Sequence, residues 1–346
     1  MANVYSLRIG MLSRRVDSRA CIWNLALLGV TLVTILLVLS RGAVPLSPRE
    51  VMHILLAPHQ TIEGNAFIVR ELRLPRVVLA VDCRGALALS GLILQSLVRN
   101  PLASPDLLGV TSGASAAVVA FLSFGAGMLG QQWMPLAAIA GAWGTALLIY
   151  LLTWRHGVSP YRLVLVGVGI SALMGAVATG LLLLSPFNTT LSSYIWLTGS
   201  VYGTNWQDVT SLTGWLALVA PLFVLLARHV PIHELDDDVD TSVGAALERR
   251  RSALLLLSVA LSGTAIAHAG AIGFVGLIAP HMEKRLVGRA FVSSVLAPVL
   301  IGANLVVVSD WVGRTLFLPL DLPAGIFISA LGSPFFLYLL IRQRHH

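Results

Sequence analysis

The stretch that decides the fold lies between residues 85 and 113 and reads GALALSGLILQSLVRNPLASPDLLGVTSG. Its first part is apolar and rich in small residues up to Val98, and the turn NPLASPD follows at 100–106. A continuous helix is prevented here because Pro105 lacks an N–H group and restricts Ser104 to extended angles. The apolar pattern resumes directly after the turn. The stretch therefore predicts two apolar helices joined by a tight connection.

The same alternation of apolar runs and short polar connections continues along all 346 residues. Apolar residues make up 56% of the chain and charged residues 11%, which is less than half the roughly 25% typical of soluble domains. Runs of about 20 apolar residues are long enough to cross a bilayer as helices. The composition predicts an all-α membrane protein with many spans. It excludes a soluble enzyme, a nucleic-acid-binding protein and a disordered scaffold.

We expect a cytoplasmic N-terminus over residues 1–20 and a membrane domain with ten transmembrane helices over residues 21–342. Residues 44–74 form a predicted extracytoplasmic connection that contains a capped short helix, and residues 229–251 form a long polar cytoplasmic connection. One segment is short and interrupted by glycine and proline, so we do not expect it to cross the full bilayer alone. The ten helices, of which the eighth is this short segment, are placed near residues 21–40, 76–97, 107–127, 133–153, 162–184, 208–227, 252–270, 272–283, 292–315 and 323–341.

The basic residues test this topology. With ten spans and a cytoplasmic start, most of the 23 lysine and arginine residues fall on the cytoplasmic side, as the positive-inside rule requires. We therefore expect both termini in the cytoplasm of a bacterium and the chain in its inner membrane. The formal net charge of +7 reflects this topology and does not indicate nucleic acid.

Catalytic and metal-binding patterns are missing from the sequence. The single lysine, Lys284, is not preceded by the glycine-rich loop of a nucleotide-binding site. Cys21 and Cys83 suggest neither a disulfide framework nor a metal site, and His268 and His281 have no carboxylate or cysteine at ligand spacing. We expect no enzyme activity, no metal site and no cofactor bound directly by this chain.

Several charges fall inside apolar runs, where each is costly in lipid. Asp310 and Arg314 are four residues apart, so they can pair along one helix face. Asp82 and Arg84 interrupt the second span, and residues two apart on a helix do not face each other. These two charges therefore need partners on other helices or water, and both a polar pathway and a hydrated buried ion pair remain open.

The long cytoplasmic connection at 229–251 carries five acidic residues between 234 and 240 and ends with three arginines. This order favours a short helix, because acidic groups stabilise the N-terminal end of a helix dipole and basic groups the C-terminal end. Two interpretations remain open: a solvated loop, or a helix on the membrane surface that docks another protein.

Together these motifs resemble the FecCD family, the permease subunits of type II ABC importers for iron-siderophores, haem and vitamin B12. The resemblance covers about residues 22–342. It is carried by segments at residues 73–76 (RLPR), 85–91, 94–95, 99–113, 270–281 (GAIGFVGLIAPH), 310–314, 321–325 (DLPAG) and 332–336 (GSPFF). The sequence departs from the family pattern at Asp82-Cys83-Arg84, where the family usually has an apolar stretch.

The resemblance implies the type II ABC importer permease fold and several partners. These are a second permease subunit, identical or paralogous, two cytoplasmic ATP-binding subunits that use the ATP, and an extracytoplasmic substrate-binding protein. By motif position, the docking arginines for the binding protein are Arg73, Arg76 and Arg314, and the cytoplasmic gate comprises Asn100 and Leu102. The segment that couples to the ATPase falls on Leu235, Asp236, Asp237, Asp238, Gly244, Glu248 and Arg249.

The function that the resemblance implies is the translocation pathway for an iron(III)-siderophore across the inner membrane. Haem and cobalamin import by the same kind of permease are alternatives. A different class is an ion-coupled secondary transporter that uses Asp82, Arg84 and Asp310 as a relay, and a third is a receptor or assembly factor. The aromatic segment at 187–207 is compatible with cargo contact and with anchoring at the membrane interface.

Overall fold

We describe a computed structural model, in which residues 4–9, 12–57, 64–155, 159–227, 247–287, 295–317 and 320–343 are placed. A small antiparallel hairpin, β1 (Val4–Ile9) and β2 (Leu12–Asp17), comes first, with Val4 opposite Asp17 in the register. The sequence did not predict these strands. The rest of the described chain is built from helices and short connections.

The helices follow the predicted apolar segments. They are α1 (Ser18–Ser40), α2 (Pro48–Leu56), α3 (Asn65–Phe67), the π-helical turn η1 (Ile68–Arg73), α4 (Leu74–Val98), the 3₁₀ turn η2 (Pro105–Leu108), α5 (Val110–Ala120), the π-helical turn η3 (Phe121–Gly125), α6 (Ala126–Leu129), the 3₁₀ turn η4 (Gln131–Trp133), α7 (Met134–Thr153), α8 (Pro160–Leu184), α9 (Phe187–Thr198), α10 (Trp206–Ala227), α12 (Leu247–Ala269), α13 (Val275–Leu286), α14 (Leu296–Leu316) and α15 (Ala324–Gln343).

Within the described chain, eight helical segments are long and apolar enough to cross a membrane. The apolar part of α15 is shorter, and α13 has 12 residues with Pro280 inside it. These two correspond to the tenth and the short eighth predicted segments, so all ten predicted segments are helical. Helix α9 is an additional helix that the sequence did not predict as one.

The second span begins earlier than predicted. Its helix starts at Asn65 and continues through η1 into α4, so Pro75 lies inside continuous helix. A proline in a helix leaves a backbone carbonyl without its usual N–H donor. In the π-helical pattern that carbonyl is Arg70 O, which accepts a hydrogen bond from Trp206 Nε1 at 3.0 Å. A tryptophan from α10 thus replaces the missing donor.

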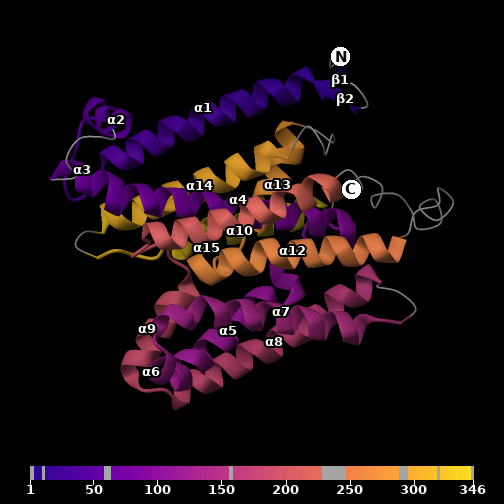
Figure 1. Cartoon of the computed structure of the whole chain (residues 1–346). Coiled ribbons are helices and arrows are strands. Elements are labelled where there is room, and N and C mark those ends of the chain that lie inside the picture. Colours follow the sequence, from indigo (N-terminus) through magenta and orange to yellow (C-terminus); the bar gives the residue numbers. More distant parts are fainter. Residues whose placement is uncertain are drawn as a thin grey trace.

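Helix α4 is the centre of one half of the bundle. It packs against α12, α14, α13 and α10, while α5 packs against α7 and α8 in the other half. In Figure 1 the two halves lie one above the other, and α1 lies along the outside of the α4 half. Close approach requires glycine where α4 meets α13, because a Cβ on Gly91 would lie 1.9 Å from the carbonyl oxygen of Gly276.

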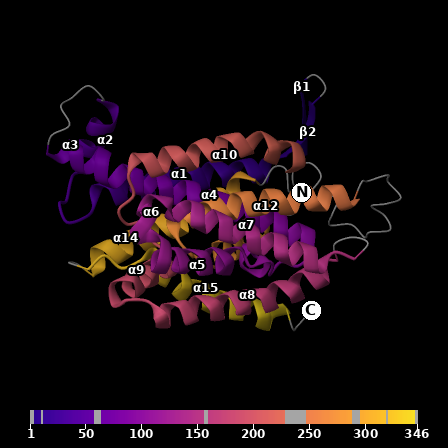
Figure 2. The ribbon, with the colours of Figure 1, turned by 60° about the horizontal axis from the view of Figure 1, so that its bottom comes forward.

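The two ends of the bundle differ. The hairpin, the beginning of α12 and the C-terminal end of α15 lie at one end, called the inner end here, and α2, α3 and α9 lie at the opposite, outer end (Figure 1). The view in Figure 2 shows the same separation of α2 and α3 from the hairpin. The first and last described helices therefore both reach the inner end, as an even number of crossings requires.

Candidate functional site

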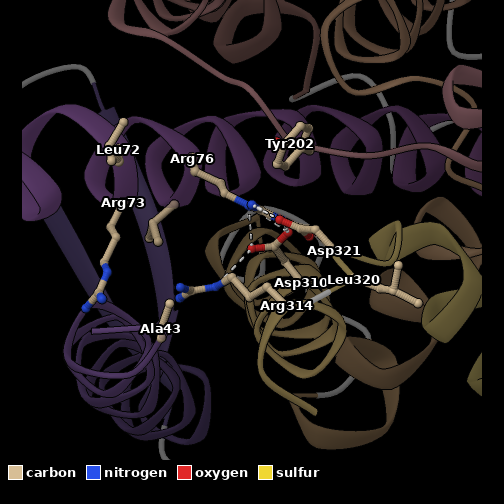
Figure 3. A pocket seen from close by; sticks show the side chains of 11 residues that line it. Ala43, Leu72, Arg73, Arg76, Tyr202, Asp310, Arg314, Leu320 and Asp321 are labelled. Carbon is tan, nitrogen blue, oxygen red and sulfur yellow. Dashed lines mark hydrogen bonds and ion pairs between the residues drawn. The ribbon is translucent and has the colours of Figure 1, made fainter. Parts of the chain in front are cut away.

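The charged motifs at residues 73–76 and 310–314 lie close together at the outer end. Arg73 and Arg76 are three residues apart at the start of α4, whereas Asp310 and Arg314 are four apart near the end of α14. Because α4 and α14 pack side by side, their side chains converge on a pocket of about 300 Å³ (Figure 3). Its lining residues are Gly42, Ala43, Leu72, Arg73, Arg76, Val77, Tyr202, Asp310, Arg314, Leu320 and Asp321.

Arg76 is the hub of this pocket. Its Nε lies 3.0 Å from both carboxylate oxygens of Asp310 and its Nη2 lies 2.7 Å from one of them. The same guanidinium donates to Asp321, from Nη1 at 2.7 Å and from Nη2 at 2.8 Å. The ring of Tyr202 lies 5.6 Å from its carbon Cζ, within cation–π range. Arg76 therefore connects α4 to α14, to the segment before α15 and to the segment before α10.

Arg73 and Arg314 serve a different structure, the end of α1. The last four carbonyls of a helix lack intrahelical donors, and in α1 each of them is satisfied from outside the helix. Two are satisfied by side chains, since Arg73 Nη1 donates to Leu39 O at 2.6 Å and Arg314 Nη2 donates to Val38 O. The other two accept backbone N–H groups, from Arg41 to Leu37 O at 3.1 Å and from Leu46 to Ser40 O at 2.9 Å. Cations at this end also complement the helix dipole.

Gly42 makes room for both guanidiniums. A Cβ at this position would lie 2.9 Å from Arg73 Nη2 and 3.3 Å from Arg314 Nη1. Both distances are shorter than ordinary van der Waals contact with carbon. The glycine after α1 thus allows the two arginines to reach the helix end together.

The pocket carries a surplus of positive charge, because three guanidiniums line it with two carboxylates. Arg314 Nε lies 3.7 Å from Asp310, which completes the chain of charges Arg76–Asp310–Arg314. The side chain of Asp310 is 3% exposed and that of Asp321 is 27% exposed. An acidic group that approaches from the outer end therefore meets a net positive field.

The predicted gate residues lie elsewhere, in the turn after α4. Asn100 is exposed and its Oδ1 accepts a hydrogen bond from Leu102 N at 2.9 Å, while Leu102 is half-buried. The turn begins with Arg99 in the left-handed conformation, at φ 54°. It packs against α13, because a Cβ on Gly276 would lie 2.9 Å from Pro105 Cδ.

Asp106 is the last residue of this turn, and it is half-buried. Thr111 and Ser104 donate hydroxyl hydrogen bonds to its carboxylate. Burial raises the pKa of Asp106 above its ordinary value, and these two hydrogen bonds oppose that shift. The carboxylate thus links the turn to the first residues of α5.

The predicted ATPase-coupling residues are mostly outside the described chain. Leu235, Asp236, Asp237, Asp238 and Gly244 lie outside the described residues. Glu248 and Arg249 are in the first turn of α12 at the inner end, and Glu248 Oε1 lies 3.7 Å from Arg251 Nη1. The structure therefore separates Glu248 and Arg249 from the predicted docking arginines by the length of the bundle.

The charges within the second span do not pair with each other. Asp82 accepts a hydrogen bond from Thr213 of α10 at 2.6 Å, so it has found a partner on another helix as expected. Arg84 is fully buried, and its guanidinium has no hydrogen-bond partner among the described residues. The described structure therefore does not join Asp82, Arg84 and Asp310 into one relay.

Three residues that contact or make room for the arginines of the outer pocket, Asp321, Tyr202 and Gly42, were not assigned a role from the sequence. Asp321 opens the motif DLPAG at 321–325, so the motif itself marked its position but not its partner. Tyr202 belongs to the predicted aromatic segment. Gly42 carries no sequence signal beyond its place after the first span. Among the described residues, no group of three or more His, Cys, Asp or Glu side chains could hold a metal ion.

One protein family matches this chain over nearly its whole length. The model of the FecCD transport family matches residues 30–342.

Individual relatives agree. The achromobactin transport system permease protein CbrC of Dickeya dadantii is 55% identical over 352 residues, which cover 100% of this chain and 98% of that protein. The ferric enterobactin transport system permease protein FepG of Escherichia coli is 36% identical over 95% of this chain and 98% of its own length.

Among solved structures, a metal-chelate type ABC transporter in an inward-facing conformation superposes with a TM-score of 0.81. It is 27% identical in sequence, and the match covers 92% of this chain and 98% of that one. The fold expected from the sequence, that of a type II ABC importer permease, is confirmed by this similarity.

Proposed function

Because the chain belongs to the FecCD transport family, we propose that it forms the translocation pathway for an iron(III)-siderophore. It is a multi-pass inner-membrane permease subunit of an ABC transporter, and a transport component rather than an enzyme. The observation that carries the cargo class is the match of at least 95% of the chain to permeases named for achromobactin and ferric enterobactin. Hydrophilic iron chelates cannot cross hydrocarbon, so a pathway between helices has to open alternately to the two sides.

In the proposed assembly, other subunits hydrolyse ATP and deliver the substrate. It contains a second permease subunit, two ATP-binding subunits that hydrolyse the ATP, and an extracytoplasmic substrate-binding protein. The inner end of the bundle faces the cytoplasm in this proposal, which is supported by the excess of basic residues in the connections at that end. The segment from Leu235 to Arg249 then contacts an ATP-binding subunit.

We assign docking of the substrate-binding protein to the outer pocket with Arg73, Arg76 and Arg314. The assignment is supported by the position of the pocket at the outer end and by its surplus of positive charge. Arg76 is the member whose side-chain partners are carboxylates, whereas Arg73 and Arg314 also hold the end of α1. Asn100 and Leu102, in the turn against α13, form the cytoplasmic gate in this proposal.

Uptake by intact cells tests the proposed cargo. A strain that lacks this permease is complemented with the gene and supplied with radiolabelled ferric siderophores, haem or cobalamin. We expect restored uptake of a ferric siderophore that vanadate abolishes. Restored uptake of haem or cobalamin alone would contradict the ferric-siderophore cargo. Uptake that a protonophore inhibits and vanadate does not would contradict the ATP-driven mechanism.

A further inference from the structure

Arg76 holds two carboxylates at the same time. Its Nε and Nη2 are directed to Asp310, and its Nη1 and Nη2 to Asp321 (Figure 3). Both interactions are of the two-pronged kind that a planar guanidinium forms best. The two carboxylates nevertheless differ in how firmly the rest of the protein holds them.

Asp310 is a fixed partner. It lies within α14, its side chain is 3% exposed, and Arg314 is a second cation at 3.7 Å. Removal of a partner from a buried charge leaves that charge uncompensated at high cost. No approaching group can displace Asp310 without unpacking the helix.

Asp321 is held less firmly. It lies in the segment between α14 and α15, its side chain is 27% exposed, and among the described residues its hydrogen bonds are those with Arg76. The backbone beside it has separate anchors, since Leu322 N donates to Gly313 O at 3.4 Å and Gly325 N to Gly199 O at 3.1 Å. The carboxylate can therefore leave Arg76 while the segment keeps its place.

The guanidinium of Arg76 has no free pair of N–H groups for a third carboxylate beside these two. Three of its nitrogens already donate to aspartates, Tyr202 covers its carbon Cζ at 5.6 Å, and the side chain is 12% exposed. An incoming carboxylate that is to bind in the two-pronged manner has to replace one of the two present. Asp321 is the one that the geometry allows to leave.

We propose that Asp321 occupies the position of a docking carboxylate, and that an acidic side chain of the substrate-binding protein replaces it on Arg76 when the two proteins associate. The inference rests on the proposed docking role of Arg76 and specifies how that role is exercised. The pair with Asp321 is retained in the free permease because a half-buried guanidinium whose N–H groups are only partly satisfied is unfavourable. An intramolecular carboxylate thus competes with the partner for one cation.

The test measures the affinity of the importer's own purified substrate-binding protein for the complete transporter in nanodiscs. Asp321→Asn removes the competitor with little change in shape. The control, Glu71→Gln, removes a half-buried negative charge five residues before Arg76 in the same continuous helix. It therefore reports the general electrostatic effect of a lost negative charge on an acidic partner. We expect Asp321→Asn to tighten binding about two- to fivefold more than Glu71→Gln, the range of a partly exposed ion pair.

A second background ties the effect to Arg76. The double variant Arg76→Gln with Asp310→Asn removes the docking cation together with its buried partner, so Asp310 is not left as an uncompensated charge. We expect it to weaken binding, and we expect Asp321→Asn to produce no further tightening in it.

Unchanged or weaker binding by Asp321→Asn, while the double variant weakens binding, overturns the exchange and leaves the docking role intact. Unchanged binding in the double variant overturns the docking role of Arg76, and the exchange with it. Equal tightening by Asp321→Asn and Glu71→Gln also overturns the exchange, because it shows a general effect of charge.

Discussion

Arg73 Nη1 lies 2.6 Å from the carbonyl oxygen of Leu39, so a side chain from the second span closes the last turn of the first. Arg73 also donates from Nη2 to Val44 O, beyond the helix end. Arg73 as a whole residue is 7% exposed. An arginine that sequence similarity associates with an external partner therefore also has an internal structural role.

The first prediction concerns this role. Arg73→Met removes the donors to Leu39 O and Val44 O. It leaves the buried carbonyl of Leu39 unsatisfied, at a cost of about 1–3 kcal/mol. We expect a lower unfolding temperature of the purified permease in detergent. Arg49→Gln, at an exposed arginine of the same end, is the matched control and should change it little. Equal effects of the two variants would contradict the capping role.

Gly42 provides an independent test of the same arrangement. Gly42→Val places methyl groups where Arg73 Nη2 and Arg314 Nη1 lie, so at least one guanidinium has to move. Overpacking of this kind costs about 1–3 kcal/mol. The control is Gly29→Val within α1, where a Cβ meets nothing within 4 Å. Thermal unfolding of both variants should separate them, and a stable Gly42→Val protein would show that the helix end needs neither arginine.

The ion pair of Arg76 with Asp310 predicts strong coupling between the two residues. Asp310→Asn leaves Arg76 and Arg314 without their shared buried carboxylate, and the loss of one partner from a buried pair costs about 3–5 kcal/mol. The double variant Arg76→Gln with Asp310→Asn should recover much of this loss. Unfolding temperatures of the two single variants and the double variant measure the coupling. Additive losses would contradict a direct pair.

The close crossing of α4 and α13 predicts that a larger side chain at Gly91 disrupts the helix packing. Gly91→Ala would bring its Cβ to 1.9 Å from Gly276 O, which backbone movement alone can relieve. We expect the variant to assemble poorly and to run as aggregate in size-exclusion chromatography. Gly175→Ala in α8, where a Cβ meets nothing within 4 Å, should behave as the unmodified protein. A monodisperse Gly91→Ala protein would contradict the tight crossing.

The sequence predicted the membrane helices well, because a run of apolar residues is needed wherever a helix crosses lipid. The start of the second span lies at Asn65 and not near residue 76 as predicted, because the helix continues through Pro75. The donor that makes a continuous helix possible there, Trp206 Nε1, comes from a residue more than a hundred positions away. Helix α9 was missed as a helix because it contains polar residues such as Asn188 and Thr189 and is too short to give a membrane signal.

The contacts of the outer pocket were predicted only in part. The pairing of Asp310 with Arg314 followed from their spacing, but the closer partner of Asp310 is Arg76 on another helix. The roles of Arg73 and Arg314 at the end of α1 could not be predicted, because their acceptors are backbone carbonyls. Such carbonyls carry no signature in the sequence.

The central claim is that this permease, within an ABC importer, moves a ferric siderophore at the expense of ATP. The most direct measurement uses proteoliposomes that contain the purified complete transporter, with ATP at the inner end of the permease and binding protein loaded with radiolabelled ferric siderophore at the outer end. We predict accumulation of the label that requires both hydrolysable ATP and the binding protein. Accumulation at the same rate with a non-hydrolysable ATP analogue would contradict the account.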